Sequence, residues 1–286
     1  MSAHSSTKRR TVPELAALKG QRKIVSLTAY IAPIARQLDP YVDFILVGDS
    51  TAMVGYGLPD TLSITVEQMT AHAAAVVRTT QHACVVVDMP FGSYQASPQE
   101  AFKQAAYMLA HSGAAAVKIE GGAALAETTR FLVERGIPVL AHVGLMPQYV
   151  NTMGGFKAQG LHDAAAQQIT RDALAHQEAG AFGVVLEGIA EPLARQLTAT
   201  LTIPTIGIGA SPACDGQVLV TEDILGLGEG KIPKFAQPFA DVGAVIRDAV
   251  QQYAQAVQDG RFPTLQHCFG VKTAPSSSND ESNSKP

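Results

Sequence analysis

The chain has 286 residues, 47% of them hydrophobic, and a formal net charge of −4 at pH 7. This length and apolar content suit a large-cored globular protein, since α/β barrels of about 250 residues fold as one domain. The acidic balance, with one short basic cluster at residues 8–10, argues against a nucleic-acid backbone as a partner. No transmembrane-length apolar stretch and no secretion signal are evident, so we expect a soluble, cytoplasmic protein.

The N-terminal residues predict a disordered leader followed by a short helix. Residues 1–10 are polar and show no periodicity. Thr11 and Glu14 then form a capping-box pattern around a proline, which predicts a helix to about Leu18 that Gly20 ends. Such a helix before the first strand would close the bottom of a barrel.

Eight strand candidates follow, mostly separated by helical patterns. They are residues 23–28, 43–48, 83–88, 115–120, 137–142, 182–187, 204–208 and 217–221. Most are continuous β-branched runs, typical of parallel strands covered by helices on both faces. This alternation predicts a single (β/α)8 (TIM) barrel over residues 11–270. A dinucleotide-binding fold is disfavoured because the glycines at 207–209 come late and no third glycine follows.

Two helices carry clear boundary signals. Ser97 and Glu100 read as a second capping box with Pro98 in the first helical position, and Gly113 ends that helix. An Ala-rich helix over residues 163–179 ends at Gly180.

Two connections are long, residues 50–63 and residues 146–160. Both follow strands at their carboxyl ends, where long loops form lids or binding walls; packing between subunits is the alternative. The last segment, residues 271–286, holds one valine as its only large apolar residue and is predicted to be a disordered tail.

Five apolar strand runs end on ionisable side chains. These are Asp49, Asp88, Lys118 with Glu120, His142 and Glu187. Because parallel strands bring their carboxyl ends to one rim, where a barrel places its active site, we expect these groups to gather there. The three carboxylates Asp49, Asp88 and Glu120 are the oxygen ligands that Mg²⁺ prefers. The alternative is structural: strand-end carboxylates also cap helices or pair with arginines.

The other groups suggest roles at such a site. Lys118 and Glu120 are two residues apart and share one face of their strand, so the lysine would neutralise a substrate carboxylate or an enolate oxygen. A structural ion pair and a Schiff-base lysine are the alternatives. His142 is a candidate ligand-orienting group, acid or core residue, and Glu187 a candidate general base. Ser50 reaches the site only if the chain turns there.

Eleven segments resemble the ketopantoate hydroxymethyltransferase family. They are KIVSLTAY (23–30), ILVGDS (45–50), DTLSIT (60–65), DMPFGSYQASP (88–98), AAAVKIEGG (114–122), PQYVNTMGGFKAQG (147–160), GAFGVVLE (180–187), IPTIGIGA (203–210), CDGQVLV (214–220), IPKF (232–235) and GRFP (260–263). The segments run in order across about residues 11–270, so the likeness covers nearly all of the expected folded part.

The resemblance implies a (β/α)8 barrel that binds one Mg²⁺ per subunit and assembles as a homodecamer. It implies transfer of a hydroxymethyl group from 5,10-methylenetetrahydrofolate to 3-methyl-2-oxobutanoate through a Mg²⁺-stabilised enolate. The product is 2-dehydropantoate, in the first step of pantothenate biosynthesis. Matching these motifs to the family implies a role for each site residue. Asp49 and Asp88 would ligate the metal, and Glu120 would complete its surroundings through water. Ser50 and Lys118 would bind the substrate carboxylate and oxo group, His142 would line the pocket, and Glu187 would remove the C3 proton.

Several positions depart from the family pattern. Ile31 stands in place of a usual Asp, Met146 of a Thr, Gly188 of a Cys and Ser211 of a Gly. None of them removes an implied metal ligand or the implied base. The loss of a carboxylate at Ile31 could slow turnover, and Ser211 could change the conformation of a loop that needs positive φ. Two other functions stay open: a Mg²⁺-dependent C–C lyase of the phosphoenolpyruvate-mutase and isocitrate-lyase type, and an inert paralogous subunit.

Overall fold

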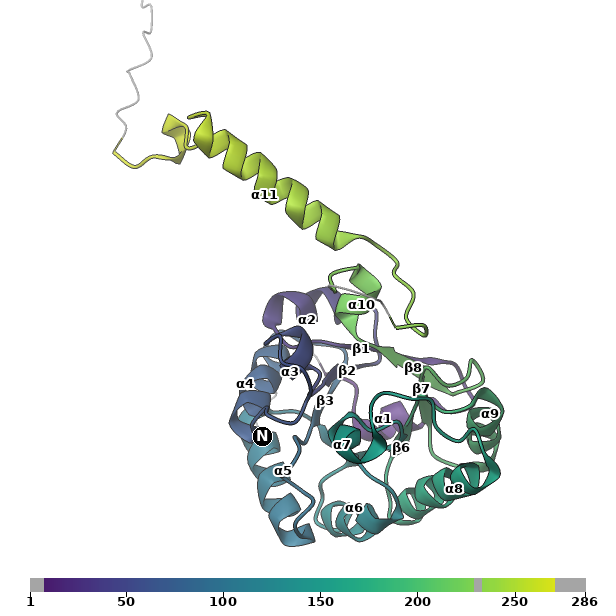
Figure 1. Ribbon diagram of the computed structural model, residues 1–286. Helices are drawn as coiled ribbons and strands as arrows, with labels where there is room; N and C mark the ends of the chain where they lie inside the picture. Colours follow the sequence, from purple (N-terminus) through teal and green to yellow (C-terminus); the bar gives the residue numbers. More distant parts are fainter. Residues whose placement is uncertain (1–7, 229–232, 271–286) are drawn as a thin grey trace, which may run out of the picture. The chain divides into compact units, whose positions relative to one another are not determined.

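The computed structural model describes residues 8–228 and 233–270. Eight parallel strands close into one barrel in sequence order (Figure 1). The strands are β1 (Ile24–Thr28), β2 (Phe44–Val47), β3 (Cys84–Asp88), β4 (Ala116–Glu120), β5 (Val139–Gly144), β6 (Gly183–Glu187), β7 (Thr205–Ile208) and β8 (Gly216–Leu219). Each predicted strand is present with ends shifted by no more than two residues, so the predicted (β/α)8 barrel is confirmed.

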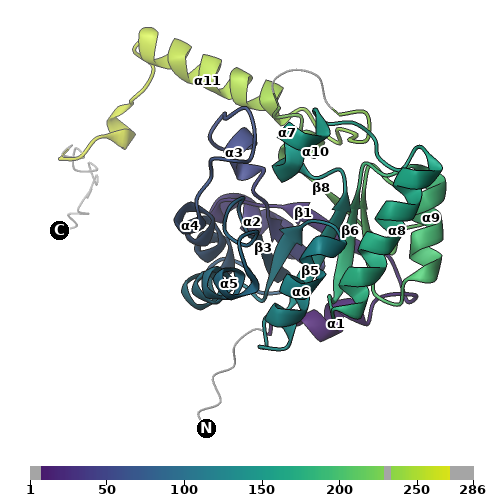
Figure 2. The same cartoon turned by 60° about the horizontal axis from the view of Figure 1, so that its bottom comes forward.

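Helices surround the strands, and two of them lie within the long connections. The helices of this unit are α1 (Val12–Ala16), α2 (Ala32–Leu38), α3 (Thr51–Val54), α4 (Val66–Val77), α5 (Pro98–Ser112), α6 (Ala126–Val133), α7 (Val150–Met153), α8 (Asp163–Glu178), α9 (Glu191–Thr200) and α10 (Thr221–Leu225). Figure 2 shows α3 and α7 at one end of the barrel and α1 at the other. The long connections 50–63 and 146–160 therefore lie at the end opposite α1.

Chain contacts divide the protein into two units, Met1–Ala240 and Asp241–Pro286. The first contains the whole barrel. The described part of the second contains α11 (Val242–Gln258) and a 3-10 turn at Leu265–His267. One domain over residues 11–270 therefore stays a prediction for the chain beyond Ala240, and the predicted tail, 271–286, lies outside the described residues. Within the described ranges, no helix combines the length and apolar character needed to cross a membrane.

The predicted helix ends are mostly confirmed. Thr11 caps α1 with a full capping box, and Gly113 ends α5 with φ 75°. At the start of α5, only half of the predicted capping box forms. The Ser97 hydroxyl accepts a hydrogen bond from the Glu100 amide, but the Glu100 carboxylate accepts from Gln104 instead of the Ser97 amide. Gln104 lies four residues after Glu100 on the same helix face, so its side chain can bind the carboxylate in place of the Ser97 amide.

The predicted disordered leader is too long at its C-terminal end. Residues 1–7 lie outside the described residues, but residues 8–10 contact the barrel. The Arg10 amide donates to the carbonyl of His82 (2.8 Å), and its guanidinium lies 3.3 Å from Asp43. These partners are distant in the sequence, so the local polarity of the leader could not reveal them.

Side chains alternate between the barrel interior and the layer under the helices. On β4, Ala116 packs in the interior cluster, while Val117 and Ile119 pack in the outer one. Val12 and Leu15 of α1 belong to the interior cluster, so this helix closes the bottom of the barrel as predicted. With the bottom closed, the inward-facing polar groups lie toward the other end.

The departure at Ile31 affects a helix start. Ile31 is the N-cap residue of α2, is 50% exposed and supplies no side-chain hydrogen bond to the helix. We expect Ile31→Asp to raise the unfolding free energy by about 1 kcal/mol, because a carboxylate at this position satisfies a free helical amide. Urea unfolding of Ile31→Asp beside Ile31→Ala tests this, since alanine removes the isoleucine without adding a cap. Equal stability of the two variants would contradict the prediction.

Candidate active site

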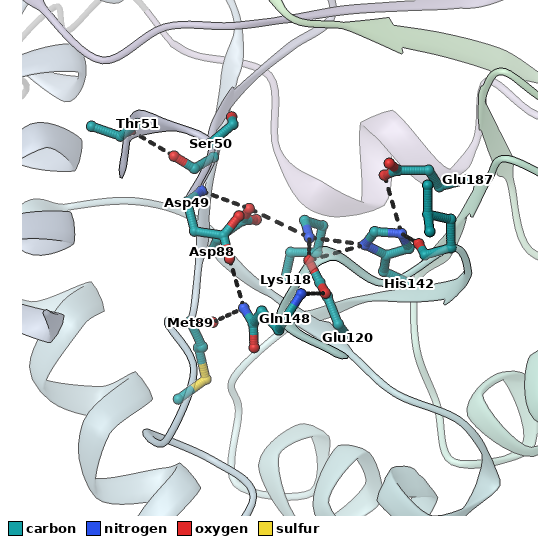
Figure 3. Close-up of polar contacts among 12 residues, drawn as sticks. Asp49, Ser50, Thr51, Asp88, Met89, Lys118, Glu120, His142, Gln148 and Glu187 are labelled. Carbon is teal, nitrogen blue, oxygen red and sulfur yellow. Dashed lines mark hydrogen bonds and ion pairs between the residues drawn. The ribbon is translucent and has the colours of Figure 1, made fainter. Parts of the chain in front are cut away.

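The predicted site residues meet in one cavity of about 1240 Å³ at the carboxyl ends of the strands. Its lining includes Asp49, Ser50, Asp88, Lys118, Glu120, His142 and Glu187. Figure 3 shows these side chains converging from β2, β3, β4, β5 and β6. The expectation that strand-end ionisable groups gather at one rim is therefore met in this structure.

The chain turns sharply after β2, which brings two consecutive residues to the cavity. The Asp49 amide donates to Asp88 Oδ2 (3.0 Å), and Ser50 takes a helical conformation at the start of α3. The Ser50 hydroxyl lies 2.9 Å from that of Tyr30. A Cβ on Gly48 would lie 2.8 Å from Ser50 Oγ, so a larger residue there would displace the Ser50 hydroxyl from this position. This is the turn that Ser50 required to reach the site.

Lys118 lies at the centre of the charged groups and is buried. Its Nζ is 3.4 Å from Asp88 Oδ2, 3.4 Å from Glu120 Oε1 and 3.1 Å from His142 Nδ1. Burial lowers the pKa of Lys118, but the carboxylates around it outweigh burial and raise it. The lysine therefore stays charged within this network.

Glu120 is stabilised as a carboxylate by the same contacts. Burial raises its pKa, but Lys118 and His142 more than offset this, and the pKa of Glu120 falls to about 2. Its Oε2 accepts a hydrogen bond from the Gln148 amide (3.0 Å). Glu120 is therefore a fixed anion beside Lys118.

Asp49 and Asp88 show the opposite behaviour. Burial, followed by the negative charges of Glu120 and Asp88, raises the pKa of Asp49 well above its usual range. Burial also raises the pKa of Asp88, although Lys118 opposes it. Asp88 Oδ1 is buried without a hydrogen-bond partner among the described residues. Asp49 has no ion-pair partner among the described residues, and Asp88 keeps one oxygen free although Lys118 lies beside the other, so the two are a suitable pair for a divalent cation.

Three carboxylates do not form a compact metal cage here. Among the described residues, no group of three or more His, Cys, Asp or Glu side chains is arranged to hold a metal ion. The Lys118 ammonium lies between Asp88 and Glu120, which explains why the third carboxylate stays apart. The donor set still fits Mg²⁺, which takes one or two protein carboxylates and keeps its other positions for water and substrate.

His142 lies between Lys118 and Glu187. Its Nε2 donates to the carbonyl of Leu145 (2.8 Å) and lies 3.3 Å from Glu187 Oε2. Burial and the Lys118 charge lower the pKa of His142, but Glu120 and Glu187 outweigh them and raise it to about 9. The Glu187 side chain is 15% exposed, against 1–4% for Asp88, Lys118, Glu120 and His142. Glu187 is thus the most accessible of these groups to an incoming substrate.

Reasoning from the sequence missed Gln148 and Tyr94, which lie outside the cavity lining. Gln148 hydrogen-bonds to Asp49 and Glu120, and Tyr94 hydrogen-bonds to Gln148. The Gln148 side-chain amide donates to Asp49 Oδ2 (2.8 Å), and the Tyr94 hydroxyl lies 2.7 Å from Gln148 Oε1. Both residues lie within segments that carry the family resemblance. No periodicity marks a buried glutamine in a loop, so its role becomes visible only from its contacts.

The departures at Gly188 and Ser211 are accommodated locally. Gly188 has φ 55°, and a Cβ there would lie 3.2 Å from Leu145 Cβ. Ser211 does not have positive φ, so the expected strain is absent at this residue. Its hydroxyl donates instead to Glu191 Oε1 (2.7 Å). The structure offers no contact that explains the departure at Met146.

His176 supports the chain directly after Glu120 and predicts a pH effect on stability. Its Nε2 donates to the Gly121 carbonyl and its Nδ1 accepts from the Thr129 hydroxyl, both at 2.9 Å. Burial lowers the pKa of His176. Below about pH 6.5 the unfolded chain therefore binds a proton that the folded protein does not, and stability falls as the pH falls, by at most about 1.4 kcal/mol per unit.

Urea unfolding at pH 7.5 and pH 5.5 checks this prediction. Because other histidines also titrate, the wild type is compared with His176→Gln at both values. We expect the advantage of the wild type over the variant to shrink at the lower pH, by about 1 kcal/mol. Parallel pH dependences in the two proteins would show that His176 is not the responsible group.

Comparison with known proteins places the chain in a family. A model of the ketopantoate hydroxymethyltransferase family matches residues 9–265. The 3-methyl-2-oxobutanoate hydroxymethyltransferase of Bordetella petrii is 57% identical over 272 residues, covering 95% of this chain and 99% of that protein. A protein of Pseudomonas aeruginosa UCBPP-PA14, 3-methyl-2-oxobutanoate hydroxymethyltransferase 1, is 55% identical over 95% of this chain and its own full length.

Solved structures with a similar fold are more distant in sequence. Phosphonopyruvate hydrolase, solved with oxalate and Mg²⁺, has a TM-score of 0.60 at 12% identity and covers 88% of each chain. A 2,3-dimethylmalate lyase of the PEP mutase and isocitrate lyase superfamily has a TM-score of 0.55 at 20% identity, covering 85% of this chain and 86% of that one. These likenesses concern the barrel fold. On the family model and the close relatives, the chain belongs to the ketopantoate hydroxymethyltransferase family of transferase enzymes.

Proposed function

We propose that the chain transfers a hydroxymethyl group from 5,10-methylenetetrahydrofolate to 3-methyl-2-oxobutanoate and forms 2-dehydropantoate, the first step of pantothenate biosynthesis. The observation that carries the proposal is the cavity itself. It combines the carboxylates of Asp49 and Asp88, whose pKa values burial raises, with the buried ammonium of Lys118 and the accessible carboxylate of Glu187. Close relatives that share more than half of their residues with the chain carry the name of this activity.

Asp49 and Asp88 would hold Mg²⁺, with Glu120 completing its surroundings through water. The free Oδ1 of Asp88 and the raised pKa values of both aspartates support this assignment. When bound, the ion supplies Lewis-acid stabilisation of negative charge on the 2-oxo group of the substrate.

The chain's own residues supply binding and proton transfer. Ser50 and Lys118 would bind the carboxylate and oxo oxygens of the substrate, since a hydroxyl donor and a buried cation suit an anionic acid. Glu187 takes the proton from carbon 3, which leaves an enolate. Water breaks the two C–N bonds of the donor methylene group, which frees tetrahydrofolate and gives formaldehyde. The enolate carbon adds to the formaldehyde carbon, and the resulting alkoxide takes a proton to become the new hydroxyl group. His142, 3.3 Å from Glu187, orients the base.

The size of the cavity supports a reaction with two substrates. Its volume of about 1240 Å³ is far more than a five-carbon oxo acid fills. Single-ligand pockets are usually about 300–1,000 Å³. A second, larger substrate such as a reduced folate would use the remaining space.

The lyase alternative is less well supported. Enzymes of that type generally carry a catalytic Cys in an active-site loop, and the connection over residues 146–160 has no cysteine. Cys84 and Cys214 are buried, and neither lines the cavity. Burial raises the pKa of Cys84 to about 12, which leaves its thiol unreactive at neutral pH.

Assembly and compartment are part of the same proposal. The family resemblance supports a homodecamer, which sedimentation equilibrium of the full chain would test. The free thiols of Cys84 and Cys214 support a reducing compartment, and we propose the cytoplasm.

Proton exchange at carbon 3 is the direct test of the proposed chemistry. Proton NMR of 3-methyl-2-oxobutanoate in D₂O, with protein, Mg²⁺ and tetrahydrofolate, follows loss of the C3 proton. We expect exchange that EDTA stops and Mg²⁺ restores. No exchange by the folded protein would contradict the proposal and favour the lyase or the inert subunit.

A further inference from the structure

Gln148 is a buried glutamine whose side chain has every hydrogen-bonding position in use. It lies in the 3-10 turn Pro147–Tyr149, directly after β5, and is 3% exposed. Its Nε2 donates to Asp49 Oδ2 (2.8 Å) and to the carbonyl of Met89 (2.9 Å). Figure 3 shows this side chain below Asp49 and beside Glu120. A buried polar group with all its bonds made fixes its neighbours as well as itself.

The orientation of the amide is determined by its partners. Because the Met89 carbonyl only accepts, the NH₂ group must face it and Asp49. On the other side, Gln148 Oε1 accepts from the Tyr94 hydroxyl (2.7 Å) and from Gln95 Nε2 (3.2 Å). A flip would turn Oε1 toward the Asp49 carboxylate and the Met89 carbonyl, which only accept, so both of these hydrogen bonds would be lost.

The backbone of Gln148 reaches a second carboxylate. Its amide donates to Glu120 Oε2 (3.0 Å), while the Tyr94 hydroxyl accepts from the Glu120 amide (3.0 Å). One loop residue thus holds one oxygen of Asp49 and one of Glu120, and ties both to the start of the connection over residues 146–160. Gln148 itself lies behind these side chains, outside the residues that line the cavity.

The neutrality of the glutamine matters for a cation site. A lysine at this position would donate equally well but would cancel the negative charge that a divalent cation needs. A glutamate would set a second carboxylate against Asp49 Oδ2, with no hydrogen to donate to it. Glutamine orients the carboxylates and leaves their charge intact.

We propose that Gln148 is a positioning residue that sets the orientation of Asp49 and Glu120 for a divalent cation. The inference rests on the proposed function, in which these carboxylates surround Mg²⁺. Residues that orient metal ligands typically contribute about 10- to 100-fold in metal affinity. We expect a loss of that size when the side-chain amide is removed.

Mn²⁺ binding measured by electron paramagnetic resonance, without either substrate, tests the proposal independently of activity. In Gln148→Met, which keeps the side-chain length but loses its hydrogen bonds, we expect the Mn²⁺ dissociation constant to rise about 10- to 100-fold. We expect the exposed Gln168→Met to bind Mn²⁺ as the wild type does. In the C3 exchange assay, saturating Mn²⁺ should restore much of the rate of Gln148→Met, a rescue that general misfolding would not show.

An unchanged Mn²⁺ affinity in folded Gln148→Met would overturn the proposal. If Gln148→Met does not fold, Tyr94→Phe decides. It removes the hydroxyl that contacts both Gln148 Oε1 and the Glu120 backbone amide, and wild-type affinity in that variant would also overturn the proposal. Failure of the proposed function looks different. A wild type that binds Mn²⁺ but exchanges no C3 proton contradicts the reaction, while the affinity of Gln148→Met still tests the positioning role.

Discussion

Glu187→Gln is expected to stop exchange of the C3 proton and with it formation of product. A positioned general base contributes about 10²- to 10⁴-fold, so we expect kcat to fall by about that factor. Glutamine has the shape of glutamate but cannot take a proton at neutral pH. The carboxylate is 15% exposed while its neighbours are nearly inaccessible, so no other described carboxylate of the charged group is as well placed to replace it.

The same variant should leave binding intact. Glu187 lies 3.3 Å from His142 and is not among the direct contacts of Asp49 or Asp88 in the described structure. We therefore expect Mn²⁺ and 3-methyl-2-oxobutanoate to bind with dissociation constants near those of the wild type. Stopped-flow measurement of product formation and NMR of C3 exchange, beside the exposed control Glu178→Gln, separate the two effects. Wild-type exchange in Glu187→Gln would assign the base elsewhere.

The sequence predicted the barrel because its signals are local and repeated. A run such as 83–87 is apolar on both faces, and its residues alternate between the interior cluster and the cluster under the helices, as the pleat requires. The site followed from the same logic, since Lys118 and Glu120 share a face of β4 and the strands that carry the other ionisable groups end at the same rim. Topology and periodicity together place six ionisable groups without any knowledge of their contacts.

What the sequence could not show depends on contacts between distant segments. Gln148 bonds to Asp49 and Glu120 across 99 and 28 residues, and nothing in its local sequence marks it as buried. The contact of Arg10 with Asp43 is of the same kind. Lys118 lies between Asp88 and Glu120 and keeps the third carboxylate apart. The spacing of residues along one strand does not predict this position, because it depends on how the side chains of neighbouring strands meet inside the barrel.

Asp88→Asn is expected to reduce the affinity for divalent metal at least about 100-fold, since changes to groups behind metal ligands alone cost about 10- to 100-fold. Asparagine keeps the acceptor for the Asp49 amide but turns an NH₂ group toward the space beside the free Oδ1. Its donor hydrogens would repel a cation. Mg²⁺ titration by calorimetry, with the exposed Asp163→Asn as the control, measures the loss.

Without metal, Asp88→Asn should not be less stable than the wild type, even though it loses metal affinity. The pKa of Asp88 is raised, so the folded protein disfavours its charge, and ionised Asp88 costs stability at neutral pH. A neutral isostere removes that cost, although Lys118 then keeps Glu120 as its nearest anion. We therefore expect Asp88→Asn without metal to melt no lower than the wild type, and to lack the rise in melting temperature that Mg²⁺ gives the wild type. A wild-type Mg²⁺ affinity in this variant would remove Asp88 from the metal site. A strongly lowered melting temperature without metal would instead show that the charge of Asp88 is needed to hold Lys118.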